Sequence, residues 1–169
     1  MTPPRMVWTW AESGHYGPRK STSENVQPPG FGPSYSPAME TTMRFTTIDS
    51  PVGPLRLVAD DVGLRRLEFR DGRSFEPVPP DWQEDAAALA PVSRQLEEYF
   101  AGTRKHFDLG LAPEGTPFQR LVWDRLLEIP YGETISYGTL ARRVGNANAS
   151  RAVGLANGRN PIAIVIPCH

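Results

Sequence analysis

Cysteine is almost absent from this sequence: its 169 residues contain one, Cys168, and only three histidines. A single thiol cannot form an internal disulfide, and a reducing cytoplasm keeps thiols free, so we expect a cytoplasmic protein. So few cysteines and histidines, scattered along the chain, also argue against a zinc site. We therefore expect no metal.

Long apolar runs and an excess of one charge are missing as well. No stretch approaches the roughly 18–20 apolar residues that cross a bilayer, and the N-terminus lacks the apolar core of a signal peptide, so we expect no membrane partner. The formal net charge is −1, which gives no overall attraction to nucleic acid. Apolar residues make up 39% of the chain, enough for the core of one domain or two small ones.

Regular patterning is missing from the N-terminal stretch. Residues 1–40 contain seven of the eighteen prolines and show a period of neither 2 nor 3.6. Such a composition buries too little apolar surface to offset its ordering entropy, so we predict a disordered Pro-rich extension over residues 1–42. Met39 and Met43 both lie just before the first patterned strand, and either is a candidate start of the native protein.

Strand-like patterns follow this extension. They predict three strands over residues 45–48, 54–59 and 64–69, separated by the turn sequences "SPVG" and "DDVG". Apolar residues at helical spacing then predict a helix over residues 86–100. Together these elements predict an α+β fold class, in which a small antiparallel sheet plus a helix form a scaffold domain over residues 43–110.

A second set of signals predicts helices. Thr116, followed by a proline, has the residue type and position of an N-cap, so a helix is predicted from residue 117. Ser136 is predicted to cap a short helix that Gly145 ends, and another helix is predicted over about residues 148–158. Two short helices joined at a glycine predict a mostly helical, helix-turn-helix (winged-helix-like) domain over residues 111–169.

The predicted final helix carries basic and small residues. From Ser136 to His169 there are four arginines and no acidic residue, a charge distribution that suits phosphate groups. A buried stripe is predicted from residues spaced i, i+3, i+4 and i+7: Ala149, Ala152, Val153 and Ala156. The opposite side carries very small residues, and such a helix fits a minor groove about 6 Å wide. Tight packing between helices is an equally good explanation for these small residues, which are Ser150, Gly154 and Gly158.

The lone thiol lies in "IAIVIPCH". A free cysteine commonly packs as a small buried apolar residue, and the preceding "IAIVI" favours that role for Cys168. Its isolation in the sequence and the neighbouring His169 favour a nucleophile instead, because a thiolate needs a nearby base or positive field. Adjacent residues of an extended chain point apart, so coupling the two side chains requires a bridging water or a turn at Pro167.

Four motifs occur in order along the chain: "IPYGETISYG", "RAVG", "NP" and "IPCH". Together they resemble the active-site domain of the O6-alkylguanine-DNA alkyltransferases, the methylated-DNA–protein-cysteine methyltransferases. The resemblance is close over residues 115–169, and "DSPVGPL" matches the start of the family's N-terminal domain. It implies irreversible, single-turnover transfer of an alkyl group from O6-alkylguanine, and from O4-alkylthymine as a second candidate base, to a cysteine. It implies no cofactor, and a monomer that acts on double-stranded DNA.

The same resemblance implies roles for individual residues. Cys168 accepts the alkyl group, and His169 acts as a water-mediated base. Tyr137 donates its phenolic proton towards the guanine and crowds the 3′ phosphate, whereas Asn160 is a hinge side chain. Arg151 fills the gap that the flipped base leaves. The residues implied to contact the DNA backbone and groove are Tyr137, Gly138, Asn146, Ser150 and Gly154.

Other interpretations stay open for these residues. Tyr137 also suits a core tyrosine, Asn160 a turn before proline, and Arg151 a solvated surface. A non-catalytic alkylated-DNA-binding or regulatory helix-turn-helix module is the alternative function, and a cysteine hydrolase would need a separated histidine and an oxyanion hole. The family continues past the histidine with an arginine, a small-residue loop and a helix containing a buried glutamate. We therefore expect this chain to be truncated just after "PCH" and to react poorly by itself.

Overall fold

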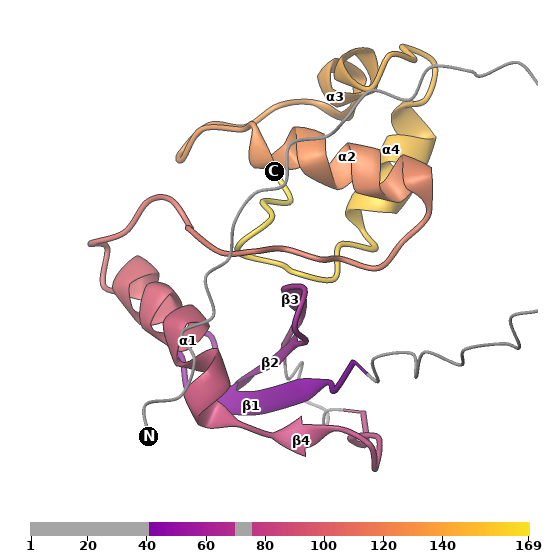
Figure 1. The fold of residues 1–169 in the computed structure, drawn as a ribbon. Helices are drawn as coiled ribbons and strands as arrows, with labels where there is room; N and C mark the ends of the chain where they lie inside the picture. Colours follow the sequence, from indigo (N-terminus) through magenta and orange to yellow (C-terminus); the bar gives the residue numbers. More distant parts are fainter. Residues whose placement is uncertain (1–40, 70–75) are drawn as a thin grey trace, which may run out of the picture.

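A four-stranded sheet forms the first half of the protein in a computed structural model that describes residues 41–69 and 76–169. The strand order is β3-β2-β1-β4 (Figure 1). The strands are β1 Arg44–Ile48, β2 Leu55–Ala59, β3 Leu64–Phe69 and β4 Gln83–Glu84. β2 pairs antiparallel with both β1 and β3, which confirms the predicted three-stranded meander. Of the extension predicted over residues 1–42, residues 1–40 lie outside the described part of the chain.

The short strand β4 corrects the prediction of a purely antiparallel sheet. Its two residues, Gln83 and Glu84, pair in parallel with the start of β1. Both are exposed, so no apolar alternation marks this strand in the sequence. The pairing holds the chain beside β1 until the backbone N–H of Asp85 donates to the carbonyl of Phe45 at 2.9 Å, where the next helix begins. The observed sheet is therefore mixed.

Asp60 shapes the turn between β2 and β3. Its side chain is 2% exposed and accepts hydrogen bonds from the backbone N–H groups of Val62 and Gly63, and from Arg65 Nε at 2.7 Å. Burial raises the pKa of this carboxyl. The hydrogen bonds and the positive charge of Arg65 outweigh burial and hold the Asp60 pKa below its ordinary value. The carboxylate is thus a structural anchor, distant in sequence from the predicted site.

Helix α1 covers one face of the sheet at the predicted residues, Ala86–Phe100. Asp85 caps it by accepting from the N–H of Ala88 at 2.9 Å. Leu89, Val92 and Leu96 recur at helical spacing and are buried in the core. Helix α1 contacts both β1 and β2, so this half of the protein has a sheet layer and a helix layer (Figure 1).

Three helices form the second half: α2 Pro117–Leu127, α3 Tyr137–Arg143 and α4 Ser150–Asn157. Thr116 caps α2 through a reciprocal capping box with Gln119, and Ser136 caps α3, as predicted. Gly145 follows α3 with a φ of +86°, a conformation that glycine adopts without steric cost. Helix α4 packs against both α2 and α3. The predicted pair of short helices is therefore present.

The buried stripe of α4 differs from the predicted one. Val153 and Ala156 are buried, but Ala152 is exposed and the polar Asn157 is buried instead. Trp123 of α2 explains part of this difference, because its indole N–H donates to the carbonyl of Ala156 at 2.9 Å from a fully buried position. This contact turns the Ala156 side of α4 towards α2 and leaves Ala152 facing solvent.

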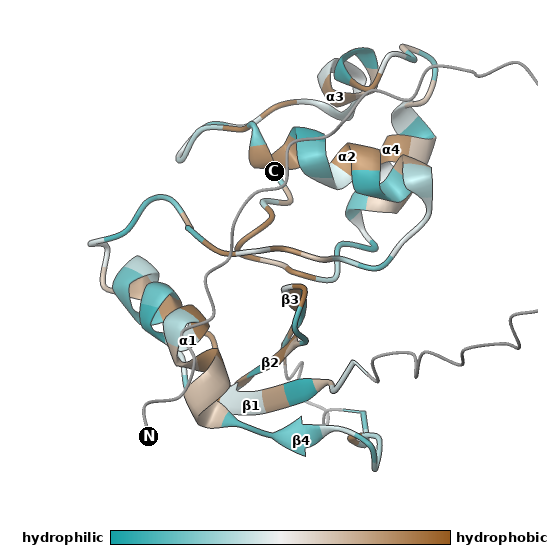
Figure 2. Cartoon of the chain, viewed as in Figure 1, coloured by the Kyte–Doolittle hydropathy of each residue, from teal (hydrophilic) through white to brown (hydrophobic). Residues whose placement is uncertain are grey.

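The two halves share one core at the edge strand β3. Leu67 N–H donates to the carbonyl of Pro161 at 2.8 Å, and Leu64 N–H donates to that of Gly110 at 2.8 Å. Two segments from later in the chain therefore lie along β3 and satisfy backbone groups at the sheet edge. Figure 2 shows hydrophobic residues concentrated in these crossing segments. The C-terminal segment is consequently fixed on the scaffold by backbone pairing and by burial of Ile162.

Candidate active site

The lone cysteine lies at the end of a tight, strained turn. The N–H of Ile166 donates to the carbonyl of Ile162 at 2.9 Å, and both side chains are fully buried. Between them Ile164 has a φ of +74°, which is rare for a β-branched residue and costs free energy. Burial of the flanking isoleucines compensates for this strain. The turn brings the chain back out of the core, so Cys168 is exposed and does not pack as a buried apolar residue.

Asn160 joins the two ends of this turn and contacts the sulfur. Its Oδ1 accepts from the N–H of Ile162 at 2.9 Å, which fixes the orientation of the carboxamide. Its Nδ2 therefore faces the carbonyl of Ile166 at 2.7 Å and Sγ of Cys168 at 3.3 Å. The amide of Asn160 therefore contacts both the backbone of the turn and the sulfur. Asn160 is thus hydrogen-bonded to both ends of the turn and is a direct neighbour of the thiol.

Tyr137 begins α3 and reaches the same region from the other side. Ser136 caps the helix by accepting from the N–H of Thr139 at 3.1 Å, which fixes the start of α3 at the tyrosine. The phenol is 48% exposed, so the interpretation of Tyr137 as a core tyrosine is wrong. Its ring lies against Gly154 of α4, where an added Cβ would come within 3.2 Å of the ring carbon Cε2. An alanine at this position would therefore require the ring or the helix to shift by a few tenths of an ångström.

Asn157 is a site residue that the sequence analysis missed. It is 4% exposed, and its Nδ2 donates to the hydroxyl of Tyr137 at 3.2 Å and to the carbonyl of Cys168 at 3.0 Å. It therefore connects the tyrosine to the backbone of the thiol residue. The available signal was its spacing: Asn157 follows Val153 by four residues, so it continues the buried stripe as a polar residue. A polar residue on an apolar stripe needs a buried partner.

The remaining predicted DNA-contacting residues lie on α3, on α4 and between them. Arg151 is exposed in the first turn of α4, and Ser150 begins that helix close to Gly138 of α3, at which an added Cβ would come within 3.9 Å of the serine hydroxyl. Asn146 is exposed in the connecting turn, where its Oδ1 accepts from the N–H of Asn148. These residues therefore share a surface with Tyr137 and Gly154.

The arginines give this surface its charge. Arg142 and Arg143 end α3, Arg151 lies on α4 and Arg159 follows it, and all four are exposed. Within residues 41–69 and 76–169, none of the four forms an ion pair with a carboxylate. Their charges are therefore available to an anionic partner, as the sequence predicted.

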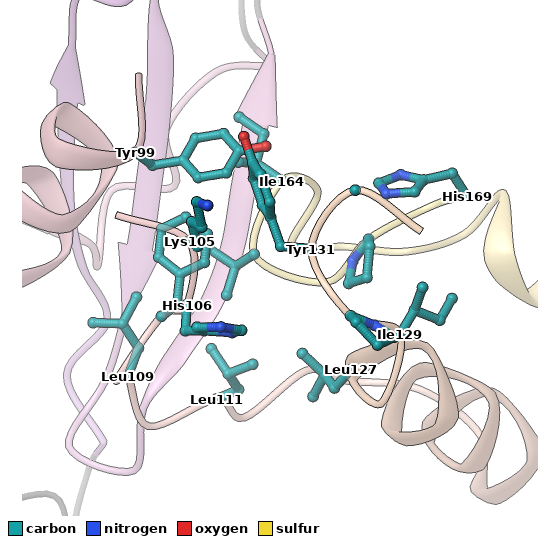
Figure 3. Close-up of a pocket in the computed structure, with 15 residues that line it drawn as sticks. Tyr99, Lys105, His106, Leu109, Leu111, Leu127, Ile129, Tyr131, Ile164 and His169 are labelled. Atoms are coloured by element: carbon teal, nitrogen blue, oxygen red, sulfur yellow. The ribbon is translucent and has the colours of Figure 1, made fainter. Parts of the chain in front are cut away.

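His169 lies beside a hollow rather than against the thiol. The hollow has a volume of about 400 Å³ and is lined by His169, Pro167 and Ile164 together with aromatic residues from the first half (Figure 3). Cys168 is not part of its lining. Among the described residues, no hydrogen bond joins the His169 imidazole to Sγ of Cys168. His169 therefore lines the hollow and does not hydrogen-bond to the thiol.

Lys105 also lines this hollow, and its ammonium group lies 5.6 Å from the centre of the Tyr131 ring.

No metal site is evident in the described ranges, where no three residues of the His, Cys, Asp and Glu types form a group that could hold an ion. None of the described helices is both long enough and apolar enough to span a bilayer.

Both halves of the described chain match family models. Residues 43–113 match the model described as "6-O-methylguanine DNA methyltransferase, ribonuclease-like domain". Residues 117–169 match the model described as "6-O-methylguanine DNA methyltransferase, DNA binding domain". The second match contains α2, α3, α4 and the strained turn with the thiol.

Individual relatives are similar over most of their length. The chain is 54% identical over 127 residues to a methylated-DNA–protein-cysteine methyltransferase of Methanosarcina acetivorans, covering 75% of this chain and 81% of the relative. The corresponding protein of Mycobacterium tuberculosis is 48% identical over 127 residues, covering 75% of this chain and 76% of the relative.

Solved structures have the same fold. The crystal structure of the M. tuberculosis O6-methylguanine methyltransferase superimposes with a TM-score of 0.70 at 48% identity, covering 76% of this chain and 77% of that chain. The M. tuberculosis OGT in complex with DNA superimposes with a TM-score of 0.68, covering 75% of this chain and 76% of that chain. The likeness includes both the sheet half and the helical half.

Proposed function

Because the chain belongs to the 6-O-methylguanine DNA methyltransferase family, we propose that it is a methylated-DNA–protein-cysteine methyltransferase that repairs alkylated DNA directly. In this proposal the alkyl group of O6-alkylguanine moves to Sγ of Cys168. The observation that carries it is the position of the thiol: exposed, at the end of a buried strained turn, with the amide of Asn160 at 3.3 Å. A nucleophile held by rigid neighbours needs little reorganisation to react.

The chemistry is an in-line displacement at carbon. The thiolate of Cys168 supplies the electron pair of the new S–C bond, while the C–O6 bond breaks and its electrons move into the guanine ring system. Tyr137 donates its phenolic proton to the base as negative charge develops there, which lowers the barrier to departure. The products are a thioether and an unmodified guanine, and the proton that left the thiol passes through solvent to restore the phenol of Tyr137. No cofactor enters this balance, and each molecule reacts once.

The helical half presents the base to the thiol. The target nucleotide must leave the duplex, because the alkylated oxygen is inaccessible within the stack. Arg151, exposed in the first turn of α4, enters the vacancy and offsets the lost stacking. Gly138, Asn146, Ser150 and Gly154 supply the small and polar surface that contacts the DNA backbone and groove. The other three arginines, Arg142, Arg143 and Arg159, form no ion pair among the described residues and bind the phosphates.

His169 is assigned a supporting role. Its imidazole forms no hydrogen bond with the thiol among the described residues, and the resemblance to the family assigns it the role of a base that acts through water. In that position it accepts the proton that leaves Cys168, and the Asn160 amide stabilises the resulting thiolate. The double-stranded substrate, the monomeric state and the cytoplasmic location are also part of this proposal and derive from the sequence.

The alternative function is a DNA-binding module that carries out no chemistry. The exposed thiol of Cys168, with the amide of Asn160 beside it, favours an enzyme. Duplex DNA containing O6-methylguanine with a labelled methyl group separates the two. We expect the label to move to the full-length gene product in at most one equivalent, and its Cys168→Ala variant to bind the duplex without taking up label. Binding by both proteins with no transfer by either would support the alternative. A matching duplex containing O4-methylthymine tests the second base.

A further inference from the structure

Asn157 is a buried side chain that hydrogen-bonds to both the proposed proton donor and the thiol residue. It ends helix α4 and is 4% exposed. Its Nδ2 lies 3.2 Å from the hydroxyl oxygen of Tyr137, twenty positions earlier in the chain, and 3.0 Å from the carbonyl oxygen of Cys168. No step of the proposed mechanism uses Asn157. Its contacts therefore require a separate explanation.

The partners of Asn157 fix the direction of each hydrogen bond. The carbonyl oxygen of Cys168 can only accept, so the amide nitrogen rather than the oxygen must face it. An amide nitrogen carries two hydrogens, and the second points to the hydroxyl oxygen of Tyr137. Tyr137 is consequently the acceptor in this contact. Its own phenolic hydrogen takes no part in it and must point elsewhere.

We propose that Asn157 is a positioning residue that keeps the phenolic hydrogen of Tyr137 directed towards the alkylated base. This inference rests on the proposed function. The Tyr137 side chain is half-exposed, so a hydroxyl without a fixed acceptor role would rotate and donate to water or to a nearby carbonyl. Accepting from Asn157 removes one lone pair and leaves the hydrogen on the open side. The same amide ties the backbone of Cys168 to this arrangement.

The other end of the carboxamide argues against a purely structural role. Oδ1 of Asn157 is buried and accepts no hydrogen bond from any described residue. A buried amide that serves stability alone normally has both ends paired, because an unpaired acceptor costs free energy. Gln95 in the first half follows that rule: it is 6% exposed, donates to the carbonyl of Asp108 and accepts from its N–H, both at 2.8 Å. Asn157 instead commits both of its donors to the active site.

The first test uses the isosteric variant Asn157→Asp. A carboxylate only accepts, so the Tyr137 hydroxyl would turn to donate to it and lose its proton for the base. We expect the single-turnover rate at saturating methylated duplex to fall about tenfold to a hundredfold near pH 7, with the DNA dissociation constant unchanged within about twofold. The rate relative to the unmodified protein should recover in acid, because a protonated carboxyl donates again. A matched buried-amide control, Gln95→Glu, should keep the rate and its pH profile.

The second test is a double-mutant cycle. Asn157→Ala should slow transfer about tenfold alone, but less than about threefold in a Tyr137→Phe protein, because its effect passes through the hydroxyl. Equal factors in both backgrounds would overturn the inference and indicate a structural role. So would a loss of DNA affinity with an unchanged rate, or an acid-insensitive defect in Asn157→Asp. If Asn157→Ala does not fold, the pH profile of Asn157→Asp decides alone.

Transfer by the unmodified protein distinguishes a failure of this inference from a failure of the proposed function. Transfer by the unmodified protein together with normal rates in both Asn157 variants would overturn only the role of Asn157. No transfer by the unmodified protein, with the thiol reduced and the DNA bound, would overturn the proposed function and this inference with it.

Discussion

Gly154→Ala should make the protein slower without making it less stable. Gly154 lies in α4 against the ring of Tyr137, and an added Cβ would be 3.2 Å from ring carbon Cε2 and 3.3 Å from Cδ2. Both distances are shorter than ordinary van der Waals contact, so one side must move by a few tenths of an ångström. The backbone of α4 is fixed by packing against α2 and α3, whereas the tyrosine ring is half-exposed. The ring is therefore the part that moves.

The structure predicts nearly unchanged stability but a slower rate. Alanine in place of glycine favours a helix interior by about 0.5–1 kcal/mol, and swinging a half-exposed ring sacrifices little packing. The loss of the hydrogen bond from Asn157 offsets this gain, so we expect the free energy of unfolding to stay unchanged within about 1 kcal/mol. The hydrogen bond from Asn157 to the Tyr137 hydroxyl is already 3.2 Å long, so the same movement breaks it. Losing a bond of about 1 kcal/mol predicts roughly a fivefold to tenfold slower transfer.

Chemical denaturation gives the free energy of unfolding, and a single-turnover assay on the same preparation gives the transfer rate. Gly158→Ala is the matched control, because an added Cβ there would meet only ordinary contacts at 3.6 and 3.8 Å, from the carbonyl oxygens of Gly154 and Leu155. It should change stability by less than about 1 kcal/mol and should not alter the position of Tyr137. A Gly154→Ala protein with an unchanged transfer rate would refute the reasoning, as would a large loss of stability.

Three further outcomes follow from other contacts. Arg151→Ala should slow transfer from duplex DNA by about tenfold or more but should change transfer from a single-stranded oligonucleotide far less. The reason is that a base leaves a vacancy only when it is flipped out of a duplex stack. Equal slowing on both substrates would contradict the role of Arg151 in filling that vacancy. Gly115→Ala should lower the free energy of unfolding by about 1–3 kcal/mol in a denaturant titration, since an added Cβ would lie 2.5 Å from the buried ring of Trp123. Asp60, whose pKa is lowered from 3.8, stabilises the fold above that pH, and this contribution is lost as the pH falls through the folded pKa. Asp60→Asn should therefore cost about 1–3 kcal/mol at pH 7 and flatten the acid dependence of unfolding, and a variant with unchanged stability at pH 7 would contradict that role.

The helices were predictable because their signals are local. The 86–100 helix has the predicted bounds, and the Thr116 and Ser136 caps lie where the residue types indicated. Each signal is an interaction within about four residues, so sequence spacing contains it. The two-residue strand β4 has no such signal, because only its parallel pairing with β1 defines it.

The α4 stripe illustrates a tertiary effect. Spacing placed Ala152 inside, but the indole of Trp123 bonds to the Ala156 carbonyl and turns the helix so that Asn157 is buried instead. A narrow stripe of small residues does not determine how the helix is rotated about its own axis against its neighbours. Only the partner helix decides it.

The candidate site likewise contains residues that sequence motifs predict and residues that only tertiary packing defines. Cys168, Asn160 and Tyr137 were predictable from motifs, and the structure brings these three together with the missed Asn157. The contact of Asn157 with Tyr137 spans twenty residues and depends on how α3 packs against α4, so no spacing rule contains it. The relation of His169 to the thiol was also undecidable from sequence, because it depends on the turn at Ile164.

Mass spectrometry of the protein after incubation with duplex DNA containing O6-methylguanine tests the central claim most directly. We expect a mass increase of one methyl group per molecule, located on the peptide that contains Cys168, with guanine restored in the DNA. A Cys168→Ser protein should remain unmodified. A methyl group on any other residue, or a reduced and DNA-bound protein that never gains the mass, would contradict it.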